Sequence, residues 1–327
     1  MELTVADEGL HPHGSEENWQ ESWAFSFRDA ETGLGAHMRV GVQINRGASN
    51  LWCAVFKDRD KVYRLNLEGV PFHPLAETAH GIGCGPQRLF HDGERLRVQL
   101  DQPECQVDLV LEDIKTSVEK FEDGGKMAAD VYRNHFNMHC RVRGVVVLDG
   151  VRLEVRNGLG WRDHSWGPRR WDNLLAHRSF HGSFGEDLNF HMLTLLTSDG
   201  NLVRRGHLVR NGVATTVGDF TIRVEILEDG VTPTRAACHM ILPGGETMTV
   251  SCHVQKGVFA QVETLQAFFG VGECYAEGRQ PGYCNFEMNN NPRHGLGDIK
   301  LAIGNTLANG FCSVKAPAWM YEPLPEG

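Results

Sequence analysis

The sequence predicts a mainly β protein built from two antiparallel barrel or sandwich units, with few short helices. Three observations support this fold class. Apolar and polar residues alternate with a period of two, as in residues 151–156 and 220–226, which is typical of antiparallel strands with one buried face. Helical periodicity is weak, and no βαβ series indicates a doubly wound nucleotide-binding fold. Two-residue turn signals separate the alternating runs, at positions 149–150, 199–200, 211–212, 229–230 and 244–245.

A loose internal similarity indicates two units. Residues 18–43 and 176–200 share a sequence pattern, in which an aromatic-rich strand is followed by an acidic turn and then by a strand carrying a His-Met pair. The pairs are His37-Met38 and His191-Met192. Two β units would then meet near residues 160–175. We therefore expect an N-terminal unit over residues 1–170 and a C-terminal unit over residues 171–327.

Bulk composition excludes several classes of function. The 327 residues include 42 acidic and 32 basic side chains, and the formal net charge of −10 argues against binding to nucleic acid or to an anionic membrane surface. No stretch approaches the roughly 20 apolar residues that span a bilayer, so we expect no membrane insertion. The N-terminus lacks a basic region followed by an apolar run, which predicts a cytoplasmic protein. The nine cysteines lack a C-x-x-C pair, which predicts reduced thiols rather than a disulfide framework or a zinc site.

The segment Gly158–Trp171, GLGWRDHSWGPRRW, concentrates the residues most able to carry chemistry. Trp161 and Trp166 offer large, rigid apolar walls. Asp163 and His164 are proton carriers. Aromatic walls with a few convergent polar groups are typical of a small-molecule pocket, so this segment is the first candidate for a functional site.

Two arginines in the same segment leave its role open. Arg162 and Arg169 can hold a carboxylate in its ionised state or bind an anionic group of a ligand. The segment could equally plug the interface between two sheets, with Asp163 in a structural salt bridge and His164 at a strand end. A carboxylate buried between aromatic walls has a raised pKa unless an arginine pairs with it, and a general acid requires that raised pKa. The residues alone leave the two interpretations evenly balanced.

Two further acidic residues are candidates. In WQESW, Glu21 and Trp23 share a face if the run is a strand. A buried Glu21 needs a partner, and an arginine of residues 162–170 is the natural choice. Glu287 is a weaker candidate of the same type, because it also fits an ordinary surface strand.

Histidines are frequent, and two of them stand four residues apart. His135 and His139 would share one face of a strand, but no third ligand stands nearby in sequence. We expect His139 to line the pocket and expect no metal site. His11 and His13 lie in a polar N-terminal tail and are expected to be solvated.

The run from Gly160 to Trp171 resembles a known motif. It matches the pattern G-x-R-D-H-S-W-G-x-R of bacterial relatives of carotenoid 1,2-hydratase, also called hydroxyneurosporene synthase. The patterns W-x-E-x-W-x-F-x-F at 19–27 and NRG at 45–47 lie where those relatives have similar elements. The resemblance implies a lipocalin-like, calycin-type double β-barrel with an apolar ligand inside or between the barrels. It also implies non-redox chemistry, such as alkene protonation, hydration, isomerisation or ring closure.

The resemblance also assigns roles. Asp163 would donate a proton, and His164 would tune this proton donor. Trp161 and Trp166 would stabilise a developing carbocation with their π faces. The substrate would be a small hydrophobic terpenoid, steroid or aromatic molecule, and no metal or redox cofactor is expected. The remaining substrate-binding residues would be Glu21, Trp23, His139, Arg162 and Arg169.

Two other functions stay open at this stage. The main alternative to an enzyme is a non-catalytic protein that binds a lipophilic ligand in the same pocket. The second is an interaction protein whose Trp-rich segment forms an interface. The sequence also leaves a homodimer open.

Overall fold

The computed structural model describes residues 3–58, 61–74, 80–92, 95–121, 133–197, 202–227, 232–262, 265–290 and 311–315. Within these residues the chain forms two large sheets in which nearly all neighbouring strands run antiparallel. The expected unit 171–327 therefore lies partly outside the described residues. The described part contains no helix that is long and apolar enough to cross a membrane.

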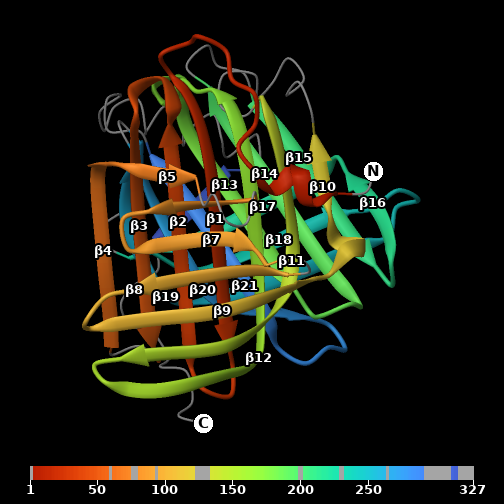
Figure 1. Ribbon diagram of the computed structural model, residues 1–327. Coiled ribbons are helices and arrows are strands. Elements are labelled where there is room, and N and C mark those ends of the chain that lie inside the picture. The colour runs from red at the N-terminus through yellow and green to blue at the C-terminus, as the bar shows by residue number, and fades with distance from the viewer. Residues whose placement is uncertain are drawn as a thin grey trace.

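The first sheet has twelve strands, and its central neighbours follow the order β2, β1, β12, β11, β9. Its strands are β1 (Trp19–Asp29), β2 (Leu34–Gln43), β3 (Ala48–Lys57), β4 (Lys61–Val70), β5 (Phe72–Pro74), β6 (Gly81–Cys84), β7 (Gln87–His91), β8 (Leu96–Asp101), β9 (Cys105–Asp113), β10 (Glu119–Phe121), β11 (Asn134–Leu148) and β12 (Val151–Pro168). In Figure 1, β7, β8 and β9 cross in front of β1 to β3 at a steep angle, as expected for a sheet that curls back over itself.

The second sheet has ten strands, and β13 lies between β14 and β21. Its strands are β13 (Leu174–Ser183), β14 (Leu188–Thr197), β15 (Leu202–Arg210), β16 (Val213–Val217), β17 (Asp219–Ile226), β18 (Pro233–Ile241), β19 (Thr247–Val262), β20 (Leu265–Ala276), β21 (Gly282–Asn290) and β22 (Phe311–Lys315). The described helices are short 3-10 turns, namely η1 (Val5–Glu8), η2 (Ile44–Arg46), η3 (Lys115–Ser117) and η4 (Trp171–Asn173).

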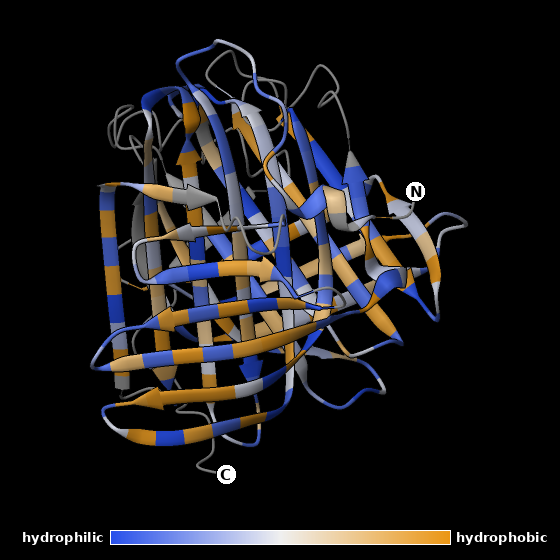
Figure 2. Ribbon diagram, in the orientation of Figure 1, coloured by the Kyte–Doolittle hydropathy of each residue, from blue (hydrophilic) through white to orange (hydrophobic). Residues whose placement is uncertain are grey.

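Both sheets are nearly closed barrels, which confirms the predicted double-barrel fold. The predicted alternation is visible as bands of hydrophobic and hydrophilic residues along the strands in Figure 2. In β17, for example, Phe220, Ile222 and Val224 are buried while Thr221 and Arg223 are exposed. The first sheet ends at Pro168 and the second begins at Leu174, while the division into units at residues 170 and 171 stays a proposal.

The predicted turns lie where the alternation requires them. Asp149 and Gly150 join β11 to β12, and both have positive φ angles, of 51° and 78°. Asn211 and Gly212 join β15 to β16 in the same way, with φ angles of 52° and 77°. Two consecutive positive φ values characterise the tight turn whose twist matches a β-hairpin. Positions 199–200 and 229–230 lie outside the described residues.

Each barrel has its own apolar core, and smaller apolar clusters bridge the two sheets. Phe25 and Phe27 belong to the first core, and Phe180 and Phe286 belong to the second. One bridging cluster joins Trp52 and neighbours on β3 to Leu193, Leu195 and Phe269. A second joins Ala24, Phe56 and Trp161 to Val271 and Tyr283. The layer between the sheets is therefore largely buried, and it holds Asp163, Trp161 and His139 among the functional candidates.

A glycine at the bulge of β11 tests this packing. Gly144 has a φ of 141°, and a Cβ atom there would lie 2.2 Å from the Asp108 carbonyl oxygen on β9. Gly144→Ala should therefore add a steric clash, worth about 1–3 kcal/mol, to the backbone strain of about 1–2 kcal/mol. Gly150→Ala is the matched control, because its φ is also positive but its Cβ would meet nothing within 4 Å. Urea denaturation measures both losses of unfolding free energy, and equal losses would contradict the close approach of β9.

Candidate active site between the two sheets

Strand β12 lies between β1 and β11, so neighbouring residues of the Trp-rich segment face opposite sides of one sheet. Asp163 stands opposite Ala24 on β1 and Asn137 on β11. His164 stands opposite Trp23 and Phe136. The odd-numbered residues of this stretch face the second sheet, and the even-numbered residues face the interior of the first barrel.

Asp163 is partly buried in the layer between the sheets, with 15% of its side chain exposed. Its Oδ1 atom accepts a hydrogen bond from the Ala24 N–H at 2.9 Å. Its Oδ2 atom lies 3.9 Å from Nδ1 of His135. Burial, together with the negative charge of Glu287, raises the pKa of Asp163 to about 7, although Arg169 and the Ala24 N–H oppose the shift. Asp163 is therefore a carboxyl group that holds its proton near neutral pH.

Glu287 on β21 is a second carboxyl group of the same layer. His37 and His177 each place Nε2 near it, at 3.5 and 3.6 Å, and Asn285 donates a hydrogen bond to Oε1 at 2.9 Å. Burial alone would raise the pKa of Glu287, but hydrogen bonds from His177 and His37 outweigh it and hold that pKa well below its ordinary value. Two carboxyl groups with pKa values driven apart are the arrangement expected of an acid and a base.

Histidines from both sheets surround these carboxyl groups. We call the set the inter-sheet histidine layer, and all of its members are buried. The rings of His181 and His191 stack with centroids 4.0 Å apart, and His181 also lies 4.3 Å from the ring of Trp161. Strands of both sheets therefore contribute to one continuous polar cluster. The layer consists of His37, His135, His139, His177, His181 and His191.

Several polar atoms of this layer have no hydrogen-bond partner among the residues that the structure describes. They include both ring nitrogens of His139, Nε1 of Trp161, Nδ1 of His181 and Oδ1 of Asn285. Burial, helped by the charge of His191, lowers the pKa of His139 to about 3, so its ring is neutral at pH 7. An unpaired buried polar atom costs about 1–3 kcal/mol. This cost favours a bound polar group, from a ligand or water, that pairs with these atoms.

Aromatic side chains adjoin the polar cluster. His37 stacks on Trp52 with ring centroids 4.5 Å apart, and it meets the ring of Phe269 edge-on with centroids 4.8 Å apart. The Tyr283 hydroxyl forms a short hydrogen bond with the hydroxyl of Ser26. The layer therefore combines aromatic walls with polar centres. The surroundings of Asp163 are thus more polar than the apolar pocket expected from the sequence.

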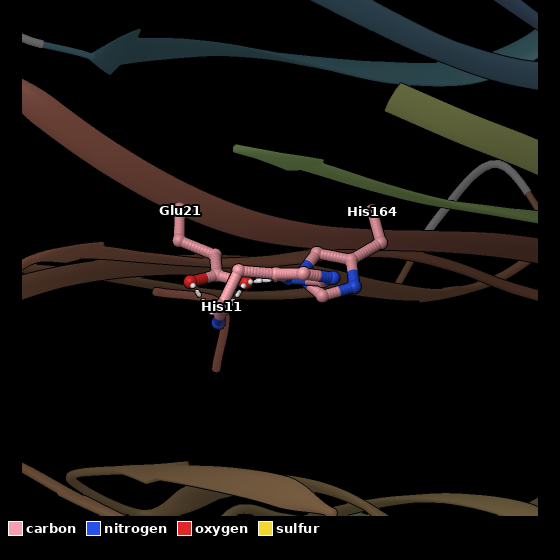
Figure 3. Close-up of side chains that lie close together, drawn as sticks. All are labelled: His11, Glu21 and His164. Carbon is pink, nitrogen blue, oxygen red and sulfur yellow. Dashed lines mark hydrogen bonds and ion pairs between the residues drawn. The ribbon is translucent and has the colours of Figure 1, made fainter. Parts of the chain in front are cut away.

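The even-numbered residues build a different cluster inside the first barrel. His164 is fully buried, and its Nε2 lies 2.8 Å from Oε1 of Glu21. His11 places Nδ1 2.7 Å from the same oxygen, and Figure 3 shows the three side chains converging. Trp23 stacks on His164 at 4.3 Å. His164 therefore does not contact Asp163, and the expectation that it tunes that carboxyl group is wrong.

The observed partners of Glu21 and Arg162 also differ from those expected from the sequence. Glu21 binds two histidines rather than an arginine of residues 162–170. Arg162 instead forms buried ion pairs with Glu8 at 2.7 Å and with Asp113 at 2.8 Å. The reason is the alternation of β12, which directs Arg162 to elements that cover the interior of the first barrel.

The remaining candidate residues are likewise divided between the two faces of the first sheet. Arg169 donates to the Ser22 hydroxyl at 3.1 Å and stacks its guanidinium over Trp171. Trp161 faces the second sheet, whereas Trp166 stacks on His11 at 3.7 Å on the other face. The two tryptophans are therefore not walls of one pocket. His139 lies in the inter-sheet layer, as a pocket-lining role requires.

Sequence reasoning missed several residues of the layer. Glu119 accepts hydrogen bonds from His191 Nδ1 at 2.8 Å and from Asn137 at 3.2 Å, and it also pairs with Arg205. The one signal that could have found His191 is the repeated His-Met pair, since His37 and His191 both lie in the layer. No spacing within the sequence indicates Glu119.

An open cleft of about 600 Å³ lies elsewhere, along strands β7, β8, β9, β11 and β12 of the first barrel. Its lining includes Arg88, Gln99, Asp101, Asp108 and Arg152. None of the candidate site residues lines it. This cleft is therefore separate from the residues that the sequence singles out.

Comparison with known proteins places the chain in a family. A family model described as a domain of unknown function, DUF7064, matches residues 4–292. The chain belongs to the DUF7064 family. No curated protein matches its sequence.

Solved structures share the fold of this DUF7064 chain. An AttH candidate from Nitrosomonas europaea has a TM-score of 0.62 at 13% identity, over 88% of this chain and 96% of that one. Kievitone hydratase from Nectria haematococca has a TM-score of 0.60 at 9% identity, over 89% and 93%. CghA, crystallised with Sch210972, has a TM-score of 0.59 at 10% identity, over 86% and 94%. At such identities the likeness establishes the fold, and function has to be argued from the site.

The unpaired atoms of His139 give a first test of the site in this DUF7064 chain. His139→Leu removes two buried nitrogens that lack hydrogen-bond partners, so it should leave the stability of the free protein unchanged or raise it by about 1–3 kcal/mol. His135→Leu is the matched control on the same strand face, because Nδ1 of His135 bonds the Ser165 hydroxyl at 2.7 Å. This control should destabilise the protein. Denaturant titration of both variants measures the difference, and a large loss from His139→Leu would refute the unpaired state.

Glu119 gives a test of the contact between the sheets. Burial would raise its pKa, but His191 and Arg205 hold that pKa well below its ordinary value. Its stabilising contribution is therefore present above pH 4.5 and is lost as the pH falls from there through the folded-state pKa. Glu119→Gln should cost about 3–5 kcal/mol at pH 7, because the partners lose a buried charge, and the cost should shrink in acid.

The control for this variant is Glu246→Gln, which breaks the exposed pair with Arg210. Its effect should be small, because exposed ion pairs contribute little. Thermal unfolding of both variants between pH 3 and pH 8 makes the comparison. A cost for Glu119→Gln that did not change with pH would argue against an ionised Glu119.

Proposed function

We propose that this chain is an acid–base enzyme of the hydratase, isomerase or cyclase type, whose active site is the layer between the two sheets. One observation carries the proposal. Asp163, largely buried and anchored by a single backbone N–H, faces a layer in which several polar atoms have no hydrogen-bond partner among the described residues. Such a site can bind a ligand by pairing those atoms and can deliver a proton to it.

Asp163 and Glu287 would share the proton transfers. In a hydration, the Asp163 carboxyl donates its proton to one carbon of a double bond, and the other carbon becomes cationic. The π face of Trp161 stabilises that cation. Water then bonds to the cationic carbon and gives one proton to Glu287. Glu287 releases that proton to solvent and Asp163 takes one up from solvent, so both groups return to their starting states. The chain supplies both the acid and the base.

The layer favours a substrate with an apolar ring system and polar substituents. Trp52, Phe269 and Trp161 offer aromatic contact to the ring. His139 and Asn285 offer hydrogen bonds to hydroxyl or carbonyl groups. We therefore retain a small hydrophobic aromatic, terpenoid or steroid substrate and add that it carries polar groups. Kievitone hydratase, which shares the fold, is by its name an enzyme of the proposed reaction class.

Replacement of Asp163 tests the proposal. Asp163→Asn preserves shape and hydrogen-bond capacity but removes the acid, so it should lower turnover by about 100-fold or more and leave the fold intact. The assay incubates the protein in D₂O with a panel of ring-substituted alkenes and alcohols, including kievitone. Mass spectrometry then detects deuterium gained at carbon.

Asp108→Asn is the control, because this carboxylate is exposed on β9 and lies outside the layer. It should keep full turnover. Retained turnover in Asp163→Asn would exclude Asp163 as the acid. Binding of panel compounds without turnover, in the unaltered protein and in the variant alike, would favour the alternative of a lipophilic-ligand-binding protein.

A further inference from the structure

A second polar cluster lies on the opposite face of β12 from Asp163. His11, Glu21 and His164 come from the N-terminal segment, β1 and β12, and their potential ligand atoms all lie within 4.8 Å of one another. Figure 3 shows these atoms pointing toward a common centre. The proposed acid–base reaction uses none of them. Two imidazoles and one carboxylate form a ligand set that zinc and related divalent metals prefer.

The hydrogen bonds of His164 show which of its nitrogens is available. Nδ1 lies 2.9 Å from the backbone carbonyl oxygen of Asp7. A carbonyl oxygen only accepts, so Nδ1 carries the hydrogen. Nε2 therefore faces Glu21 either as a second N–H or as a bare lone pair that a cation can bind. A backbone carbonyl that fixes the far nitrogen is the usual support of a metal-binding histidine.

The surroundings hold the ligands in place. Trp23 stacks on His164 at 4.3 Å, and Trp166 stacks on His11 with the ring planes 4° apart. Both stacks restrict ring rotation, so the donor atoms are oriented before an ion arrives. Glu21 has 2% of its side chain exposed, whereas His11 has 17% exposed. His11 therefore lies at the entrance through which an ion or a water ligand can reach the centre.

The charge balance also favours a cation. Next to the trio, the ion-paired group of Glu8, Asp113 and Arg162 has two formal negative charges and one positive charge. Arg162 lies 5.5 Å above the ring of Phe136, and that ring lies 5.5 Å from His164. The ion-paired group, whose formal charges sum to −1, is thus linked to the trio through Arg162 and one aromatic ring. Together with the Glu21 carboxylate, this net charge would offset a divalent ion.

We propose that His11, Glu21 and His164 form a binding site for a divalent transition metal, with zinc as the best-matched ion. Adjacent ligand atoms of tetrahedral zinc lie roughly 3.3 Å apart, given bond lengths of about 2.0–2.1 Å. The Glu21 oxygen now lies 2.7 and 2.8 Å from the two ring nitrogens. A shift of about half an ångström therefore admits the ion, and His11 can make it because it lies outside the strands. The ion would tie the N-terminal segment to the barrel.

Zinc binding by the purified full-length chain tests this site. Competition with a chromophoric chelator should show one zinc ion per chain that depends on His11, and His11→Ala should weaken it at least 10-fold. Zinc should also raise the melting temperature of the unaltered protein but not that of His11→Ala, because only the folded site binds it. His13→Ala is the matched control, since His13 is exposed in the same segment. This control should bind zinc like the unaltered protein.

Two further measurements separate this site from the thiols and the inter-sheet histidine layer. Glu21→Gln should weaken zinc binding like His11→Ala. Cobalt(II) should give the visible absorption of a tetrahedral nitrogen and oxygen site, without a thiolate charge-transfer band, and His11→Ala should abolish it. Equal zinc affinity with and without His11, or no zinc binding, would overturn the proposal and leave the trio as a hydrogen-bonded ion pair. That result would not affect the role proposed for Asp163, which lies on the other face.

Discussion

The alternation of side chains along β12 is the constraint on which both polar clusters depend. This strand lies between β1 and β11, and the sheet is covered on both faces. The polar residues near its centre have little contact with bulk water, so each needs a partner from another element. Asp163 finds its neighbours in Ala24 on β1 and His135 on β11. His164 finds its neighbours in the N-terminal segment and in Glu21 on β1. One strand thus builds two sites that share no side chain.

The polar layer between the sheets lowers the free energy of unfolding, because it buries polar atoms. The architecture explains why the protein tolerates this loss. Each sheet closes around its own apolar core, so most of the apolar burial that stabilises either barrel lies outside the layer. Apolar clusters around Trp52 and around Trp161 hold the sheets together on the flanks. Glu119 adds an ionic contact from β10 to β14 and β15. The centre of the layer can therefore hold ring nitrogens, such as those of His139, that have no hydrogen-bond partner among the described residues.

The sequence predicted local features well, because these depend on near neighbours. The hairpin turn at Asp149-Gly150 and the buried face of β17 follow directly from turn chemistry and alternation. The choice of which residues meet across the layer depends on register and on how the sheets stack, and no single segment encodes either. Glu119 and His191 are 72 positions apart and meet only in the folded chain.

The clearest errors came from treating nearness in sequence as nearness in space. Asp163 and His164 were expected to act together, but alternation separates them. His11 was expected to be solvated with His13, and it is instead half-buried between Trp166 and Glu21. A polar tail has no periodicity that reveals such docking. His11 is partly buried because its ring stacks on Trp166 in the folded barrel.

The pKa values of the two carboxyl groups in the layer shift in opposite directions. This difference follows from their partners rather than from burial. Both are buried, and burial raises the pKa of each. Glu287 accepts a hydrogen bond from Asn285 and lies 3.5 and 3.6 Å from Nε2 of His37 and His177, so its ionised form is retained. Asp163 accepts one backbone N–H, and the charge held on Glu287 further disfavours its own ionisation. The ionised state of one carboxyl group therefore helps to keep the proton on the other, and this coupling gives the layer an acid and a base at the same pH.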